Sequence, residues 1–547
     1  MGARSASVAP HPSPVRGPRA RQRRIRRRHH HHDRSGDQLM KPSPPGDGKK
    51  SPELLPQIVA DRAASHPDSP AIVHGETQLT YSELNTQIRR AAAVFENEDI
   101  KHGDRLVVVG HNSIGWIVAY LAGLRVGAVV SPANNRLNTG QFVEQCALLD
   151  AQIVLHDADH AELAAHTGRR TIALEDLEDL RGPESDTAIR SNPDDDAVVS
   201  FTSGTTGTPK GAVLSHRAVV AASQAIATRI SVHAGDSTLV LVPLFHNTGF
   251  IDQLGVMLVT GGSTHLMKKY RTSDALAELV ARPVSYLTAV PSILRMVMVS
   301  EDAETIFHEA QVVLFGGSPM PNAWSEELLT RWPHLRLVHG YGLTEFTSGC
   351  TTLPPDLIGV KGESVGFPLP GVDLQILGDD GRAATAGDTG EILVRGVTRM
   401  SRYWKQPELT AAKTSGDWLR TGDLGYLDED GLLWLTGRVD DVINRGGEKV
   451  LPAHVESKIA KLAPVSEATV FPIPDLVLQQ RVAAAVTIRS GRSFNVDQAL
   501  TQLRTELPDY AIPEQWVIYE ELPRTASGKS DRRAIAREYQ EGKARHA

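Results

Sequence analysis

The feature that most constrains the fold is a regular alternation of two patterns, which begins at about Ser51. Short runs rich in β-branched residues, typical of buried strands, alternate with Ala- and Leu-rich stretches of helical periodicity. Four clear strand-like runs cover 106–110, 128–130, 238–243 and 312–316. Strands that alternate with helices form sheets covered by layers of helices. The sequence therefore predicts an α/β protein.

The length of the chain and a change in its sequence pattern predict two folded domains. A chain of 547 residues exceeds what one hydrophobic core organises. Shorter strands and turns such as Asp430-Gly431 fill the stretch up to Gly437, and a small α+β pattern follows Arg438. We expect a large N-terminal domain of layered sheets and helices over 51–437 and a small α+β C-terminal domain over 438–547.

Residues 1–50 differ from the rest in charge and composition. They carry 13 Lys/Arg and 3 Asp/Glu, a net charge of +10, whereas the remaining residues bring the total down to -7. Rich in Pro, Arg and Ser, this segment is predicted to be a disordered basic tail. A misassigned start, with Met40 as the true one, and an Arg-rich transit peptide are the alternatives. The acidic remainder argues against nucleic acid as a partner.

The two cysteines and the longest apolar run indicate in which compartment the protein resides. Cys146 and Cys350 cannot form a disulfide framework and lack metal-ligand spacing, so we expect a reducing, cytoplasmic compartment. The run 114–130 contains Arg125 and three glycines and is too short to cross a bilayer. It predicts a buried helix that leads into a strand, and no membrane span.

The stretch SFTSGTTGTPKGAVLSH, residues 200–216, has the composition of a phosphate-binding loop. A strand pattern over 197–202 leads into glycines that let backbone N–H groups turn towards an anion. A Walker loop needs Gly-Lys-Ser/Thr opening a helix, but Thr-Pro-Lys-Gly and a strand-like run follow Gly207. A Walker-type ATPase or kinase is therefore disfavoured. The predicted phosphate ligands are Thr202, Ser203, Gly204, Thr205, Thr206, Gly207 and Lys210.

A second motif, HGYGLTE at 339–345, suits a nucleotide and a metal ion. The ring of Tyr341 stands between glycines and can lie against a purine. Thr344 offers a hydroxyl, and Glu345 offers the hard oxygen that Mg²⁺ prefers.

Three shorter motifs add candidate ligands. GGSP, which begins at Gly316, follows a strand, and α/β sheets bind ligands at such strand ends. Asp423 stands on a tight turn whose carboxylate can take both hydroxyls of a ribose. PRTASGK places Lys529 on a glycine-bearing loop near the end of the chain.

Together these motifs resemble the adenylate-forming superfamily, in the branch of acyl-CoA synthetases and fatty- or aryl-acid–CoA ligases. Residues 202–211 match its hallmark TSGTTGxPKG at every fixed position, and the resemblance runs in order over roughly 52–540. It implies that Tyr341 contacts adenine, Thr344 the α-phosphate and Glu345 the metal. It also implies roles for Gly316 and Gly317 beside the adenine and acyl sites, Asp423 at the ribose, Arg438 at the nucleotide, Asp440 as the hinge of a mobile C-terminal domain, and Lys529 as the catalytic lysine.

The resemblance implies ATP-dependent activation of a carboxylic acid to an acyl-adenylate, release of pyrophosphate, and transfer to CoA, with Mg²⁺ as the metal. Amino-acid-activating relatives place an Asp beside a Phe in the region of Phe245, and this sequence has none there. We therefore expect a mainly apolar pocket for a fatty or aromatic acid. Its predicted lining is His246, Gly316, His339 and Gly340.

Departures from the family pattern leave the acceptor open. They lie at Gln479-Gln480, Tyr510-Ala-Ile-Pro513, Arg402-Tyr-Trp404 and Ser530. They do not touch the predicted adenylation residues. The alternatives to CoA are a carrier protein, an amine, or a nucleophile such as nitrite in diazotising secondary metabolism. A non-enzymatic binding protein is disfavoured because Glu345 and Lys529 are both present.

Overall fold

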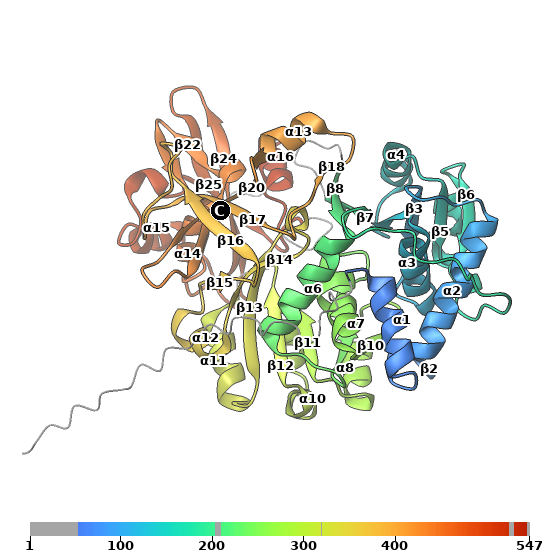
Figure 1. Cartoon of the computed structure of the whole chain (residues 1–547). Helices are drawn as coiled ribbons and strands as arrows, with labels where there is room; N and C mark the ends of the chain where they lie inside the picture. The colour runs from blue at the N-terminus through green and yellow to red at the C-terminus, as the bar shows by residue number, and fades with distance from the viewer. Residues whose placement is uncertain (1–52, 203–208, 319, 525–529, 544–547) are drawn as a thin grey trace, which may run out of the picture. The chain divides into compact units, whose positions relative to one another are not determined.

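The computed structural model describes residues 53–202, 209–318, 320–524 and 530–543. The predicted tail, 1–50, lies outside these ranges. Within them, sheets and helices alternate along the chain (Figure 1), and the predicted α/β fold class is confirmed.

The first sheet has nine strands in the order β15-β14-β13-β12-β11-β9-β10-β1-β2. The neighbours from β1 to β13 across its centre run parallel, and β14 closes antiparallel on β13. Its strands are β1 (Pro70–His74), β2 (Thr77–Thr80), β9 (Ser237–Val240), β10 (Ser263–Leu266), β11 (Tyr286–Ala289), β12 (Val312–Gly316), β13 (Arg336–Gly342), β14 (Gly349–Leu353) and β15 (Phe367–Pro368).

The second sheet has seven strands in the order β18-β8-β7-β4-β3-β5-β6. From β7 to β6 the neighbours run parallel, and β7 and β8 form an antiparallel hairpin. Chain order reverses at β3, because β4 lies on one side of it and β5 on the other. The strands are β3 (Arg105–Val109), β4 (Val129–Ala133), β5 (Ile153–His156), β6 (Arg170–Ala173), β7 (Asp196–Thr202), β8 (Lys210–Ser215) and β18 (Arg402–Tyr403).

Helices cover both sheets, and Figure 1 shows α6 and α7 lying together. The helix α3 is buried on almost every side because α1 and α2 pack against it together with β3 and β4 of the second sheet, and it leads directly into β4. The predicted buried helix running into a strand is thus confirmed. The helices are α1 (Leu55–Ser65), α2 (Tyr81–Asn97), α3 (Ile114–Val126), α4 (Thr139–Leu149), α5 (Ala161–Ala165), α6 (His216–Ile230), α7 (Val256–Thr260), α8 (Thr272–Ala281), α9 (Pro291–Met298), α10 (Ala303–Glu309), α11 (Asn322–Arg331) and α12 (Pro355–Lys361).

Two smaller sheets follow along the chain. The first links β16 (Val372–Leu377), β17 (Gly390–Gly396), β20 (Trp418–Leu427), β19 (Thr414–Ser415) and β21 (Leu433–Arg438), with α13 (Pro407–Lys413) between β18 and β19. The second links β23 (Glu448–Val450), β22 (Ile443–Arg445), β25 (Gln479–Ile488), β24 (Val465–Asp475) and β26 (Gln515–Tyr519), with α14 (Pro452–Ile459), α15 (Val496–Leu503) and α16 (Arg532–Gln540).

The last sheet has its own hydrophobic cores, which draw only on residues from Ile443 to Ile535. It is the small α+β unit that the sequence predicts beyond Arg438. The exact division at 437–441 and the hinge at Asp440 stay predictions.

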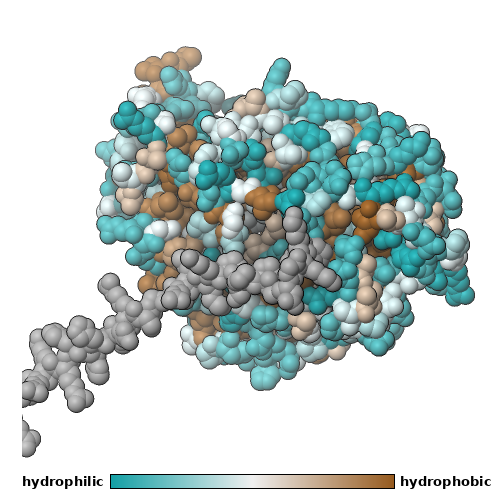
Figure 2. All heavy atoms as spheres, in the orientation of Figure 1, coloured by the Kyte–Doolittle hydropathy of each residue, from teal (hydrophilic) through white to brown (hydrophobic). Residues whose placement is uncertain are grey.

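The surface drawn in Figure 2 is mostly hydrophilic, with hydrophobic residues in small groups. Among the described residues, no helix combines the length and apolar character needed to cross a bilayer. The core instead lies between the layers, where side chains from sheet faces and helix faces meet.

Candidate active site

The hairpin of β7 and β8 presents the predicted phosphate loop. Thr202 pairs with Lys210 and Phe201 with Gly211, so the strands hold both ends of the loop together. The predicted strand before the loop is confirmed, and a strand, not a helix, follows it, which fits the failed Walker template. The predicted ligands Ser203, Gly204, Thr205, Thr206 and Gly207 lie outside the described residues.

One side chain ties this hairpin to the HGYGLTE motif. Asn247 accepts a hydrogen bond from the Ser200 hydroxyl on β7 at 2.7 Å, and its amide donates to the backbone carbonyl of Thr347. Thr347 adopts a positive φ of 67°, an uncommon conformation for a β-branched residue. Such strain is retained where the surroundings fix it, often at functional sites. These two hydrogen bonds of Asn247 place β7, the strand before the phosphate loop, beside the turn that carries Glu345.

Tyr341, Asp423 and Arg438 form the polar centre of the site. The Tyr341 hydroxyl donates to Asp423 Oδ2 at 2.6 Å, and Arg438 Nε lies 3.2 Å from Asp423 Oδ1. The β20–β21 register sets Asp423 opposite Arg438. Burial, and then the negative charge of Asp423, raise the pKa of Tyr341, so its hydroxyl remains a donor. The ring of Tyr341 and the carboxylate of Asp423, 82 residues apart in sequence, therefore converge with the guanidinium of Arg438.

Glu345 is held in one orientation by a buried tyrosine. It lies with Thr344 in a 3₁₀ turn, η4 (Thr344–Phe346), and the Tyr403 hydroxyl donates to its Oε1 at 2.8 Å. Burial and the neighbouring Glu345 raise the pKa of Tyr403. A fixed carboxylate beside the nucleotide motif supplies the donor type that Mg²⁺ prefers, so the residues present fit the predicted metal.

The predicted acid-pocket residues divide between the two faces of the first sheet. Gly316 pairs with Gly340, and His339 pairs with Phe315. Because alternate residues of a strand face opposite ways, His339 lies on the face away from Gly340. There it stacks on Phe315 with ring centroids 4.8 Å apart, and its Nδ1–H donates to the Ser364 carbonyl. Its role beside the acid stays a prediction.

A close backbone contact requires glycine at position 316, whereas the contact at Gly340 is looser. A Cβ on Gly316 would lie 2.4 Å from the Gly340 carbonyl oxygen, so only glycine fits there. A Cβ on Gly340 would meet the end of the Leu314 side chain at 3.3 Å. The next residue, Gly317, has a φ of 78°, which favours glycine.

His246 precedes a π-helix, η3 (Thr248–Gly255), and is half-buried against Phe245, with ring centroids 4.3 Å apart. Burial, with a smaller effect of Arg136, lowers the pKa of His246 to about 4. The ring is therefore neutral at physiological pH. A neutral, half-buried ring suits contact with an uncharged acyl group.

Of the two residues predicted in the C-terminal part, Asp440 lies within the described residues and Lys529 does not. Asp440 is exposed in a 3₁₀ turn, η5 (Val439–Asp441). Lys529 lies outside the described residues. Arg524 and Ser530 on either side of its loop pair across an isolated bridge.

Sequence analysis missed a second polar cluster, at the carboxyl ends of β3 and β5. His160 Nδ1 lies 2.5 Å from Asp157 Oδ1, and the His111 backbone N–H donates to Asp157 Oδ2 at 2.8 Å. Asn135 donates to His111 Nδ1 and accepts from His160 Nε2. The three titratable groups could in principle surround a metal ion, but their own hydrogen bonds already pair them. The sequence offered no signal, since the cluster depends on strand order.

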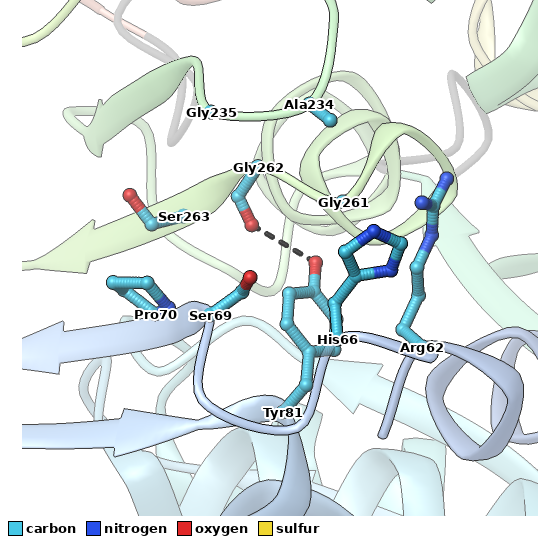
Figure 3. A pocket seen from close by; sticks show the side chains of 10 residues that line it. All are labelled: Arg62, His66, Ser69, Pro70, Tyr81, Ala234, Gly235, Gly261, Gly262 and Ser263. Atoms are coloured by element: carbon cyan, nitrogen blue, oxygen red, sulfur yellow. Dashed lines mark hydrogen bonds between the residues drawn. The ribbon is translucent and has the colours of Figure 1, made fainter. Parts of the chain in front are cut away.

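A separate cavity of about 130 Å³ lies beside Tyr81 and the turn at Gly261 (Figure 3). In Figure 3 the Tyr81 hydroxyl points at the Gly262 carbonyl, to which it donates at 2.9 Å. Arg62 donates to the Val259 carbonyl. These polar groups tie α1 and α2 to the turn after α7, and none of the predicted site residues lines this cavity.

A cluster of side chains suited to bind a nucleotide, on a layered α/β fold, is typical of ATP-using enzymes. Comparison with known proteins identifies the family. The family model described as AMP-binding enzyme matches residues 59–404, and that described as AMP-binding enzyme C-terminal domain matches 454–529. The chain therefore belongs to the AMP-binding enzyme family, and the predicted superfamily is confirmed.

Individual relatives resemble the chain over most of its length. It is 30% identical to a feruloyl-CoA synthase of Amycolatopsis over 479 residues, 86% of this chain and 95% of the relative. A structure of o-succinylbenzoate CoA synthetase from Bacillus subtilis with its acyl-adenylate intermediate shares 26% identity and a TM-score of 0.80, covering 87% of this chain and 97% of that one. An amide bond synthetase of Marinactinospora thermotolerans shares 26% identity and a TM-score of 0.81, covering 89% and 100%.

Proposed function

We propose that this protein activates a carboxylic acid with ATP and transfers the acyl group to CoA, as an AMP-forming carboxylate–CoA ligase. One observation carries the proposal: the convergence of Tyr341, Asp423 and Arg438 next to a fixed Glu345. Similarity to a feruloyl-CoA synthase and to an o-succinylbenzoate CoA synthetase with a bound acyl-adenylate supports it.

In the first step the carboxylate of the acid attacks the α-phosphate of ATP, and pyrophosphate leaves. Tyr341 provides a face for adenine, and Asp423, held by Tyr341 and Arg438, accepts the ribose hydroxyls. Thr344 and the loop from Thr202 to Lys210 donate hydrogen bonds to the phosphates. Bound at Glu345, Mg²⁺ would offset negative charge on the phosphates. Lys529 adds a positive charge where charge builds up in the transition state.

In the second step a thiol attacks the acyl carbonyl and AMP leaves. We propose CoA as the thiol, after a rotation of the C-terminal domain about Asp440. The departures at Gln479, Gln480 and Ser530 leave the acceptor open, and the similarity to an amide bond synthetase favours one alternative class, an amine. A carrier protein and a nucleophile such as nitrite are the remaining alternatives. The two buried free cysteines support a cytoplasmic location.

The first test concerns the catalytic lysine. We expect Lys529→Ala to slow acid-dependent pyrophosphate exchange by about 10²-fold or more, because roughly 3 kcal/mol of transition-state stabilisation is lost. Lys461→Ala is the control, because this lysine lies in the same C-terminal part, is exposed, and makes only a long ion pair of 3.8 Å with Glu506. A wild-type rate in Lys529→Ala would contradict the assignment.

The second test concerns the acceptor. Purified enzyme is incubated with ATP, a panel of fatty and aromatic acids, and either CoA, a primary amine or no acceptor. We expect AMP release to accelerate with CoA and an acyl thioester to form. Amide formed with an amine at rates that CoA does not match would replace CoA as the acceptor.

A further inference from the structure

The cavity beside Tyr81 lies at the edge of the first sheet opposite the candidate active site. It is lined by Pro70, the first residue of β1, and by Ser263, the first residue of β10. All neighbouring strands from β1 to β13 run parallel, so their amino ends share one edge of the sheet. Gly316 ends β12 and therefore lies at the other edge. A molecule in this cavity would be a second ligand, separate from the acid and the nucleotide.

Residues from three parts of the chain form the walls of this cavity. Figure 3 shows Arg62, His66 and Tyr81 on one side and Ser69 and Ser263 on the other, beneath the turn that follows α7. The volume is about 130 Å³. Cavities of about 150 Å³ bind benzene, so this one has room for a molecule of about five heavy atoms.

Carbonyl oxygens around the cavity already accept hydrogen bonds from the chain. The Tyr81 hydroxyl donates to the Gly262 carbonyl at 2.9 Å, and Arg62 Nη2 donates to the Val259 carbonyl at 3.3 Å. The Ser69 carbonyl accepts from the backbone N–H of Tyr81. A bound cation needs several oxygen ligands free to coordinate it. These paired oxygens therefore do not favour a metal ion.

The guanidinium of Arg62, in contrast, has donors left over. A guanidinium is a rigid fork of N–H donors, and only Nη2 of Arg62 has a hydrogen-bond partner within the described part of the chain, the Val259 carbonyl. No described Asp or Glu forms an ion pair with it. The group is half-buried and lies against Gly261, whose Cα is about as close as a side chain would allow. A half-buried cation without an acidic partner attracts an anion.

The other side chains of the cavity add donors and no negative charge. The Ser69 hydroxyl has no hydrogen-bond partner among the described residues, and in Figure 3 it points towards Gly262. His66 Nδ1 lies 3.0 Å from the Ser65 hydroxyl, which leaves its Nε2 for another partner. None of the residues that line the cavity is acidic. The polar groups left for a ligand are therefore donors, and one of them is charged.

We propose that this cavity binds a small oxyanion, an inorganic phosphate or a short carboxylate, through the Arg62 guanidinium and the Ser69 hydroxyl. The planar fork of an arginine matches two oxygens of a carboxylate or phosphate. The bound anion would connect α1 to the loop before β1. This site is independent of the proposed ligase activity, because none of its residues belongs to the candidate active site.

The experiment is a calorimetric titration of the full chain with sodium phosphate and, separately, with sodium acetate. Chloride keeps the ionic strength constant, and saturating ATP without Mg²⁺ fills the predicted phosphate loop without turnover. We expect one anion to bind per chain with a Kd of about 1 mM, an affinity that two hydrogen bonds to a charged group can supply. Tighter binding of phosphate or of acetate identifies which of the two oxyanions the cavity prefers.

Two arginine variants give the decisive comparison. Arg62→Gln should weaken binding by about 10- to 100-fold, the range of a hydrogen bond to a charged group, and Arg62→Lys should retain part of it. Arg336→Gln is the matched control. Arg336 begins β13 at the same edge of the sheet, and its one hydrogen bond within the described chain goes to the Ser231 hydroxyl at 3.2 Å, but it lies outside the cavity. The same loss of charge there should leave the Kd unchanged.

Three outcomes would overturn the proposal: no binding of either anion by wild type, wild-type affinity in Arg62→Gln, or an equal loss of affinity in Arg336→Gln. If Arg62→Gln does not fold because its bond to Val259 is lost, Ser69→Ala decides. That variant removes a donor with no partner in the described chain and should weaken binding by about 5-fold, the effect of one neutral hydrogen bond. Unchanged affinity in folded Ser69→Ala would then overturn the proposal. Failure of the ligase assays would leave these results standing, because binding is measured without turnover.

Discussion

Buried polar groups lie beside both large sheets, but they differ in how completely they are paired. At the second sheet, Asp157 takes hydrogen bonds from His160 and His111, and Asn135 completes the cluster. Beside the first sheet, Asp252 of η3 is 7% exposed, and its Oδ1 has no partner among the described residues. The cluster at the second sheet lies at the carboxyl ends of β3 and β5, where α/β sheets often bind ligands.

The difference teaches which buried polar groups stabilise the fold. A group whose partners are all within the chain stabilises the fold, and its removal costs stability. A buried group without a partner in the chain adds no such stabilisation, so its removal should cost the fold less. Variants of the second-sheet cluster should therefore change the free energy of unfolding more than variants near Asp252.

The largest effect is expected from Asp157→Ala. It leaves His160 Nδ1 and the His111 N–H unpaired in a buried setting, where breaking a charged pair costs about 3 kcal/mol. Urea unfolding should show this loss as a lower midpoint, while pyrophosphate release by the folded enzyme stays as in wild type.

Asp159→Ala serves as the matched control for Asp157. Asp159 lies 3.3 Å from His111 Nε2, but its side chain is half-exposed, so its removal should cost far less stability than the removal of Asp157. A rise in melting temperature with added Zn²⁺ that is lost in His160→Gln would contradict this comparison, because the cluster would then be a metal site.

The next effect is a pH dependence of stability. Burial raises the pKa of Asp157, but hydrogen bonds from His160 and the His111 backbone outweigh it and lower the pKa to about 2. The hydrogen bond to Asp157 raises the pKa of His160. The stabilisation from Asp157 is therefore present above its ordinary pKa of 3.8 and lost as the pH falls towards 2, and that from His160 is lost as the pH rises past its raised pKa.

The measurement is unfolding by urea between pH 2 and 8, for wild type and Asp157→Asn. The difference between them should be greatest from about pH 4 to 6.5 and should shrink by about 2 kcal/mol towards low pH. The other charged or titratable groups that face the pair are Asp159, Lys269 and His111. Burial lowers the pKa of His111. A difference independent of pH would show that the two groups are not an ion pair.

Much of the fold could be predicted from sequence because its signals are local. The runs at 106–110 and 312–316 coincide with β3 and β12, and the hairpin around the phosphate loop follows from strand patterns on both sides of Gly207. Strand order could not be predicted. The crossing from β4 over β3 to β5, which creates the polar cluster, depends on how whole layers pack.

The candidate site was predictable in part for the same reason. The approach of Tyr341 to Asp423 was implied by family resemblance, not by any pattern in the residues between them. Asp252 was missed because the family pattern places a carboxylate directly beside Phe245, seven positions earlier. Neither the π-helical register nor the lack of a partner for its carboxyl can be seen without the tertiary structure.

The smallest effect is expected from Ser348→Ala. The Ser348 hydroxyl bonds to the Asp252 carboxyl and lowers its pKa, so its loss favours the protonated, weaker acceptor. We expect the free energy of unfolding in urea at pH 7 to fall by about 1 kcal/mol, since that is what one neutral hydrogen bond contributes. This change is smaller than the one expected in Asp157→Ala. A loss of stability as large as that of Asp157→Ala would place Ser348 among the fully paired structural groups, and the contrast between the two sheets would then fail.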